Sequence, residues 1–135
     1  MTLMAVGRDD ATGEFFDGTS AGHYLIRRCI EHAHASKPQS AACPECGSVN
    51  LRWDAASGKA KLVSWTVVPG KALDPEGPAP EPTIVAIGEL EEGPWMWAQL
   101  LGAAPEELRD GMDLRIAFER PAGSEAIPVL VPAIL

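Results

Sequence analysis

The sequence has few basic residues and no long apolar run. Eleven Lys and Arg residues stand against nineteen Asp and Glu residues, which gives a formal net charge of -8 and a pI near 4.8. Because nucleic-acid phosphates require clustered cations, this balance argues against nucleic-acid binding, including single-strand binding on aromatic side chains. Nowhere do about eighteen apolar residues follow one another, and residues 1–4 lack the charged start of a leader peptide. We therefore expect a cytoplasmic protein without a membrane span.

The common catalytic motifs are missing as well. The chain contains no Gly-x-Ser-x-Gly elbow, no P-loop, no dinucleotide-binding fingerprint and no internal repeat. Its strongest nucleophiles are three cysteines, an odd number that suits metal binding in a reducing compartment better than a disulfide framework. Metal ligation would occupy these thiolates. We therefore expect a protein without a catalytic residue of its own.

All three cysteines fall within residues 29–50. Cys43-Pro-Glu-Cys46-Gly47 has the spacing in which two thiolates grip one tetrahedral ion. With no Cβ, Gly47 lets the backbone fold back so that amides point at the sulfur atoms. So few large apolar residues occur in this stretch that a metal has to supply its folding free energy. The pattern predicts a zinc ribbon, which we expect to unfold without its metal while the following barrel survives.

A closed zinc site needs four ligands, and the upstream half of the ribbon offers Cys29 and a histidine. His32 lies at Cys-x-x-His spacing, and His34 follows two residues later. We favour His32 because it occupies the place of a second cysteine, and imidazole can replace thiolate at a tetrahedral ion. His34 remains the alternative. The predicted ligands of a structural Zn²⁺ are Cys29, His32, Cys43 and Cys46.

The residues before the ribbon divide into a tail and a short helix. Residues 1–13 are small and polar, and we expect a flexible tail there. From residue 14 the pattern predicts a short helix near 14–22 and then an extended run into the ribbon. Phe15 and Phe16 either pack in the core of this appendage or offer their rings to a partner protein. We assign residues 14–50 to the helix and zinc ribbon, and 51–135 to a second unit.

Strand signals dominate residues 51–135. Runs rich in β-branched and aromatic residues alternate with Gly and Pro turns, and no βαβ rhythm occurs. Prolines and glycines make 69–82 a surface loop, and 104–111 reads as a short helical turn. The chain is therefore expected to be mostly β, with a five-stranded antiparallel OB-fold barrel after the ribbon, and a sandwich as the alternative. Extended runs are expected at 51–54, 60–68, 83–90, 95–101, 112–120 and 125–131.

The four tryptophans divide into two pairs. Trp53 and Trp65 are expected in the core, which large residues fill in small barrels. Alternation along 95–101 places Trp95 and Trp97 on one face of a strand whose other face is apolar. These two rings are therefore candidates for a partner interface.

Motifs from about residue 14 to the end resemble one family in their order and spacing. They are Phe15-Phe16-Asp17-Gly18, Cys29-x-x-His32, Cys43-Pro-Glu-Cys46-Gly47-Ser48, the runs 61–68 and 85–93, Gly111-Met112, and Ile127-Pro128-Val129. The chain resembles the acyl-CoA-associated proteins in which a rubredoxin-like zinc ribbon precedes an OB-fold, long known as a domain of unknown function. His32 stands where that family more often has cysteine.

This resemblance implies an accessory role in acyl-CoA and lipid metabolism. Family members accompany thiolase-like enzymes, acyl-CoA hydratases and aldolases, so we expect a non-catalytic subunit of a hetero-oligomer with such an enzyme. The alternative is a stand-alone module that binds CoA or an acyl-CoA thioester. Cations would then have to hold the phosphates of CoA. The candidates for that role are Lys59, Lys61, Lys71, Arg115 and Arg120.

Overall fold

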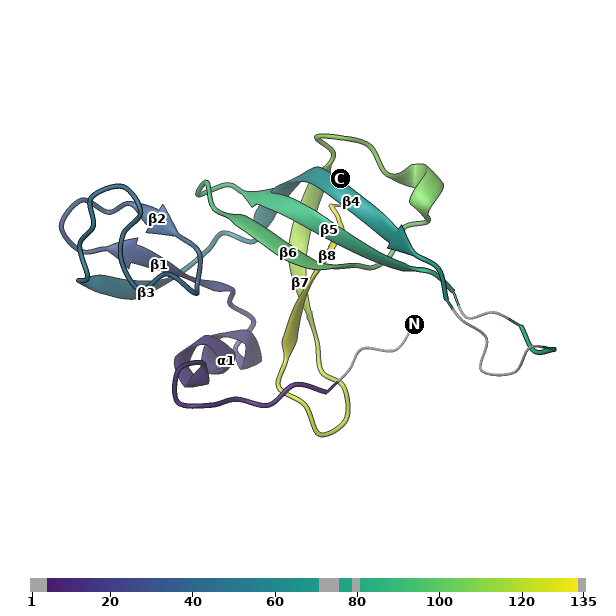
Figure 1. Ribbon diagram of the computed structural model, residues 1–135, viewed down its shortest axis with the longest axis horizontal. Helices are drawn as coiled ribbons and strands as arrows, with labels where there is room; N and C mark the ends of the chain where they lie inside the picture. Colours follow the sequence, from purple (N-terminus) through teal and green to yellow (C-terminus); the bar gives the residue numbers. More distant parts are fainter. Residues whose placement is uncertain (1–4, 71–75, 79–80, 134–135) are drawn as a thin grey trace.

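The computed structural model describes residues 5–70, 76–78 and 81–133, and it consists of a small sheet and a closed barrel (Figure 1). The small sheet and the helix before it lie on one side of the barrel. The elements in chain order are α1 (Gly13–Ser20), β1 (Leu25–Cys29), β2 (Ala35–Ser36), β3 (Leu51–Ala55), β4 (Lys59–Val68), β5 (Thr83–Leu90), β6 (Trp95–Leu100), the 3-10 turn η1 (Pro105–Glu107), β7 (Asp113–Glu119) and β8 (Ile127–Pro132).

The small sheet has the order β2-β1-β3, and both pairings are antiparallel. Arg27 in β1 pairs with Trp53 in β3, and its guanidinium lies 4.3 Å from the centre of the Trp53 ring. Residues 51–54 therefore belong to the sheet that carries the ribbon, and the barrel begins at β4. A division of the chain after residue 50 cuts through this sheet.

The barrel closes in the order β4-β5-β6-β8-β7, as expected for an OB-fold. The hairpin expected between 83–90 and 95–101 is present as β5 and β6, and the helical turn expected at 104–111 is present as η1. The barrel is not wholly antiparallel, because β6 and β8 pair in parallel at Leu100 and Leu130. Of the loop expected at 69–82, residues 71–75 and 79–80 lie outside the described residues.

One continuous apolar core joins the barrel to the small sheet. Leu62, Leu100 and Leu130 fill the barrel and are at most 1% exposed. Tyr24, directly before β1, and Ile26, within β1, belong to the same buried cluster. Because the two parts share their apolar contacts, they are expected to unfold together, which argues against a barrel that survives alone.

The two tryptophans expected in the core are only half buried. Trp65 packs against the barrel cluster, and Trp53 lies under the Arg27 guanidinium with its ring centre 6.5 Å from that of Phe15. Aliphatic residues such as Leu62, Leu100 and Ala86 take the central positions instead. A five-stranded barrel has too narrow an interior for an indole at every inward position.

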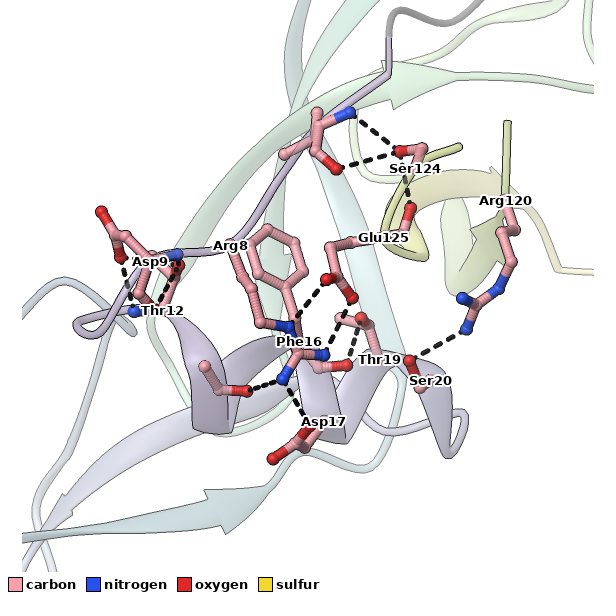
Figure 2. A network of polar contacts seen from close by, with 12 residues as sticks. Arg8, Asp9, Thr12, Phe16, Asp17, Thr19, Ser20, Arg120, Ser124 and Glu125 are labelled. Carbon is pink, nitrogen blue, oxygen red and sulfur yellow. Dashed lines mark hydrogen bonds and ion pairs between the residues drawn. The ribbon is translucent and has the colours of Figure 1, made fainter. Parts of the chain in front are cut away.

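The N-terminal segment is tied to the barrel by polar contacts (Figure 2). The Arg8 guanidinium donates to Glu125, before β8, at 2.7 and 2.9 Å, and to Asp17 in α1 at 2.7 Å. The Val6 amide donates to the Ser124 hydroxyl at 2.8 Å. The described part of 1–13 is therefore anchored where a flexible tail was expected. Farther along α1, Arg120 donates to the Ser20 hydroxyl at 2.9 Å.

Helix α1 packs its aromatic residues inward. Phe16 is 8% exposed, and Phe15 makes edge contacts with Phe16 and with Tyr24. These two phenylalanines pack in the core of the appendage, where Phe16 is buried and Phe15 is half-buried, and their contact with a partner protein stays a prediction. In the part of the chain that the structure describes, no helix has the length and apolar character needed to cross a membrane.

Candidate metal centre

Four side chains from the ribbon form a compact group of metal-ligating atoms. The Sγ atoms of Cys29, Cys43 and Cys46 and a ring nitrogen of His34 all lie within 4.8 Å of one another. Cys29 and Cys43 are buried, Cys46 is exposed, and all three are free thiols. Two loops supply the group: the turn that follows β1, and the Cys43-to-Cys46 turn before β3.

The distances within the group fit a tetrahedral ion. Cys29 Sγ and Cys46 Sγ are 3.6 Å apart, and Cys43 Sγ lies 3.4 Å from His34 Nδ1. Zn–S bonds of 2.3 Å and Zn–N bonds of about 2.05 Å at tetrahedral angles place two sulfurs about 3.8 Å apart, and sulfur and nitrogen about 3.6 Å apart. The donor set and these two distances therefore suit zinc.

The structure brings His34 into this group, where the spacing favoured His32. The Cys29 amide donates to the His34 carbonyl at 2.9 Å, which continues the ladder between β1 and β2. His34 thus stands opposite Cys29, and its side chain lies beside the thiols. His32 sits at the exposed tip of the turn, with its ring centre 5.6 Å from that of His34. The Cys-x-x-His spacing takes no account of strand pairing. The pairing of β1 with β2 decides which histidine lies beside the cysteines.

The two turns of the ribbon have the same backbone form. The Gly47 amide donates to the Cys43 carbonyl at 2.8 Å, and the Ala33 amide donates to the Cys29 carbonyl at 2.8 Å. Gly47 has φ of 74°, and Ala33 has φ of 59°, the only positive value at a non-glycine residue in the described part of the chain. Such a φ is costly for alanine. The Ala33 backbone keeps this conformation because residues outside the turn hold the turn in place, as the cysteines of the second turn would through a shared metal.

The surroundings of the group affect the pKa values of buried Cys29 and exposed Cys46 differently. Burial works to raise the pKa of Cys29, but hydrogen bonds from the His32 backbone amide, the Cys46 thiol and the Glu31 backbone amide outweigh it, and its pKa is lowered. At Cys46 the Ser48 amide works in the lowering direction, while burial and the neighbouring thiols raise its pKa to about 11. Amides thus already stabilise a thiolate at Cys29, and a cation would relieve the repulsion at Cys46.

The Glu45 carboxylate contacts the ring nitrogen of His34 that faces away from the cysteines. His34 Nε2 lies 3.3 Å from Glu45 Oε2, while Nδ1 faces the cysteines. A carboxylate on the distal nitrogen fixes the tautomer and orientation of a metal-bound imidazole. Glu45, inside the Cys-Pro-Glu-Cys turn, was not singled out from the sequence, because the spacing does not show which side chain it meets.

Three of the candidate CoA-binding cations lie at exposed positions of the neighbouring strands β4 and β7, and a fourth lies apart from them. Lys59 and Arg115 are paired across β4 and β7, and the Lys61 ammonium lies 2.6 Å from the Asp113 carboxylate. Arg120 instead contacts Ser20 in α1. Lys71 lies outside the described residues. Binding of CoA phosphates by these residues stays a prediction.

An open cleft of about 940 Å³ separates the ribbon from the β5–β6 hairpin. Trp95 and Trp97 line its barrel side and are 50% and 73% exposed, as the alternation along this strand predicts. Ser36, His34 and Glu45 line the ribbon side. The cleft depends on how the two parts pack together, and no local sequence pattern predicts it.

The fold and the site define a class: a small OB-fold barrel preceded by a ribbon with a Cys₃His group. Residues 53–119 match the family described as the ChsH2 C-terminal OB-fold domain. A "DUF35 domain-containing scaffold protein" of Pyrococcus furiosus is 38% identical over 96 residues, which cover 71% of this chain and 69% of that protein. The chain belongs to this family, DUF35.

Two further relatives extend the likeness beyond the barrel. A "Probable enoyl-CoA hydratase alpha subunit" of Thermomonospora curvata is 32% identical over 133 residues, 96% of this chain and 39% of that protein. The chain thus spans well under half of that relative. A solved structure described as "Ltp2-ChsH2(DUF35) aldolase" contains a chain that superimposes with a TM-score of 0.77 at 26% identity, covering 98% of this chain and 100% of the other.

Proposed function

We propose that the protein is a non-catalytic accessory subunit of an enzyme that acts on CoA thioesters, of the hydratase, aldolase or thiolase-like kind. The observation that carries this proposal is the full-length likeness to a DUF35 chain of an aldolase assembly, in which both chains are covered almost completely. Relatives named as a scaffold protein and as a hydratase alpha subunit point the same way. The partner supplies the catalytic residues, and this chain supplies a rigid surface.

Two features of the chain support a role without catalysis. Its strongest nucleophiles, the three cysteines, lie together in the ribbon, where metal ligation would occupy them. Its most exposed large apolar side chains include Trp95 and Trp97, which lie together on one strand, and tryptophan is enriched in the centres of protein interfaces. The proposal therefore assigns the ribbon to structure and the barrel hairpin to docking.

The proposal includes a structural zinc ion held by Cys29, His34, Cys43 and Cys46. When bound, zinc would cross-link the two turns and supply the folding free energy of a segment with few apolar contacts. A full set of four protein ligands leaves no position open for water, which suits structure better than catalysis. The chain has three free thiols, and free thiols persist in a reducing compartment. We therefore place the complex in the cytoplasm.

Co-expression with hydratase, aldolase and thiolase-like enzymes of the same organism tests the role. We expect one of them to elute with the tagged chain in near-equal amount and to lose activity or stability when the chain is omitted. The Cys43→Ser variant removes one proposed zinc ligand and should leave the ribbon unfolded. We expect this variant to fail to support the enzyme. A chain that elutes alone and changes none of these activities would end the proposal.

A further inference from the structure

The cleft between the ribbon and the β5–β6 hairpin contains buried oxygen atoms without partners. Ser36 is 4% exposed, and its hydroxyl has no hydrogen-bond partner among the described residues. Glu92 contributes a second such atom, Oε1, while its Oε2 accepts from the Ser57 amide at 2.7 Å. Both residues line the cleft. A buried acceptor without a donor is costly, so this wall suits a ligand that brings N–H groups.

The charges around the cleft favour a cation. Glu45 and Glu92 line it, and Lys37, which is exposed, is the one Lys or Arg among its described lining residues. The hairpin adds Glu89, whose carboxylate contacts the Trp95 indole at the cleft. With a net charge of -8 on the whole chain, the local and the overall fields have the same sign. Phosphates of CoA would be repelled here, whereas a guanidinium or an ammonium would be attracted.

Two indole rings face the same space. Trp97 is 73% exposed and Trp95 is 50% exposed, and the Trp95 Nε1 donates to Glu89 at 3.2 Å, which orients that ring. Trp97 also lines a second, smaller apolar hollow with Val85 and Ile87 on the outer face of the barrel. Trp is the aromatic residue that binds cations best, and the hollow beside it accepts an aliphatic neighbour.

We infer that this cleft is the docking site for an arginine-bearing segment of the partner enzyme. The guanidinium stacks on the exposed indoles and donates to the Ser36 hydroxyl and the Glu92 carboxylate, while an apolar residue next to it covers the hollow beside Trp97. Arginine suits this wall better than lysine because its planar fork combines stacking with several directed donors. The inference rests on the proposed function for the existence of the partner, and it names the partner's chemistry.

Dissociation constants for the enzyme that co-purifies with the chain test the inference. We expect Trp97→Ala and Glu92→Gln each to weaken binding about tenfold or more, as central interface residues do. Ser36→Ala should weaken it by several-fold while leaving the free chain as stable as before, because the hydroxyl has no partner to lose. Glutamine at 92 keeps the acceptor for the Ser57 amide, so the hairpin should stay folded.

The controls lie next to the tested residues. Glu91→Gln removes the same charge one position away from the cleft lining, and Val68→Ala shortens an exposed apolar residue of β4 outside the cleft. Both should bind within about twofold of the wild type. If the enzyme binds the wild type, and Trp97→Ala and Glu92→Gln also bind within twofold, the inference is wrong while the accessory role stands.

A probe tests arginine recognition without any partner. The full chain is titrated with N-acetyl-arginine methylamide and, separately, with its neutral citrulline counterpart, while the indole N–H signals of Trp95 and Trp97 are followed by NMR. We expect millimolar saturation with arginine, lost in Glu92→Gln, and at least several-fold weaker shifts with citrulline. Equal shifts from both compounds, or shifts that avoid these indoles, would overturn the inference even if an enzyme partner is found.

Discussion

Removing the side chain of Ile26 tests whether the ribbon sheet and the barrel form one folding unit. Ile26 lies in β1, is 0% exposed and belongs to the same buried cluster as the barrel leucines. Ile26→Ala deletes three carbon atoms, each worth about 0.8 kcal/mol of burial, and leaves a cavity that adds to the cost. We expect a loss of about 3–4 kcal/mol in the free energy of unfolding.

The assay is thermal unfolding of the zinc-loaded chain followed by circular dichroism. At this length each kcal/mol shifts the Tm by about 3–5 °C, so Ile26→Ala should lower the Tm by roughly 10 °C or more. Ile30→Ala is the matched control, because the same atoms are removed from a residue that is 63% exposed, and it should change stability by about 0.5 kcal/mol at most.

Native-state hydrogen exchange locates the effect. If the two parts are one unit, Ile26→Ala lowers the protection of amides in β5 of the barrel as much as that of amides in β1. The reasoning is refuted if the β5 amides keep their full protection, or if Ile26→Ala shifts the Tm no more than Ile30→Ala does. The ribbon and barrel would then be independent, and the shared cluster would contribute nothing to cooperativity.

Three more predictions follow from the described contacts. His34→Ala should reduce bound zinc from about one ion per chain to near zero by elemental analysis, whereas His32→Ala should retain it; the opposite result would make His32 the ligand. Gly18→Ala should cost about 1–3 kcal/mol in urea unfolding, because the new Cβ would lie 2.6 Å from Leu25 Cγ, while Gly13→Ala in the same helix meets nothing within 4 Å and should be neutral or stabilising. The Arg8 guanidinium holds the pKa of Glu125 below its usual range, so this carboxylate stabilises the fold above the unfolded pKa of about 4.3 and the contribution is lost as pH falls through the folded value. The Tm difference between wild type and Arg8→Gln should therefore be largest near pH 7 and shrink below about pH 4; a difference that stays constant down to pH 2 would contradict the ion pair.

Local patterns in the sequence predict most of the strands and three of the four residues in the metal-ligating group. β-branched residues mark β4 and β5, and the alternation along β6 places Trp95 and Trp97 outside. Features that depend on distant pairing are not predicted. Arg8 meets Glu125 across 117 positions, and residues 51–55 pair with β1 rather than with the barrel.

The choice of histidine shows the same limit. Spacing along the chain favours His32, but the hydrogen bond between Cys29 and His34 places the later residue opposite the cysteine. The cleft is a third example, since its walls come from β2, the ribbon turn and the β5–β6 hairpin. A pattern confined to one element carries no information about the surface that another element presents to it.

A pull-down of the tagged chain from its native cell extract tests the central claim most directly. Mass spectrometry identifies what is bound, and elemental analysis of the same sample measures zinc. The account predicts one hydratase, aldolase or thiolase-like enzyme in near-equal amount and about one zinc ion per chain. A chain recovered alone, or one that carries an enzyme but no metal, would contradict the account of a zinc-stabilised accessory subunit.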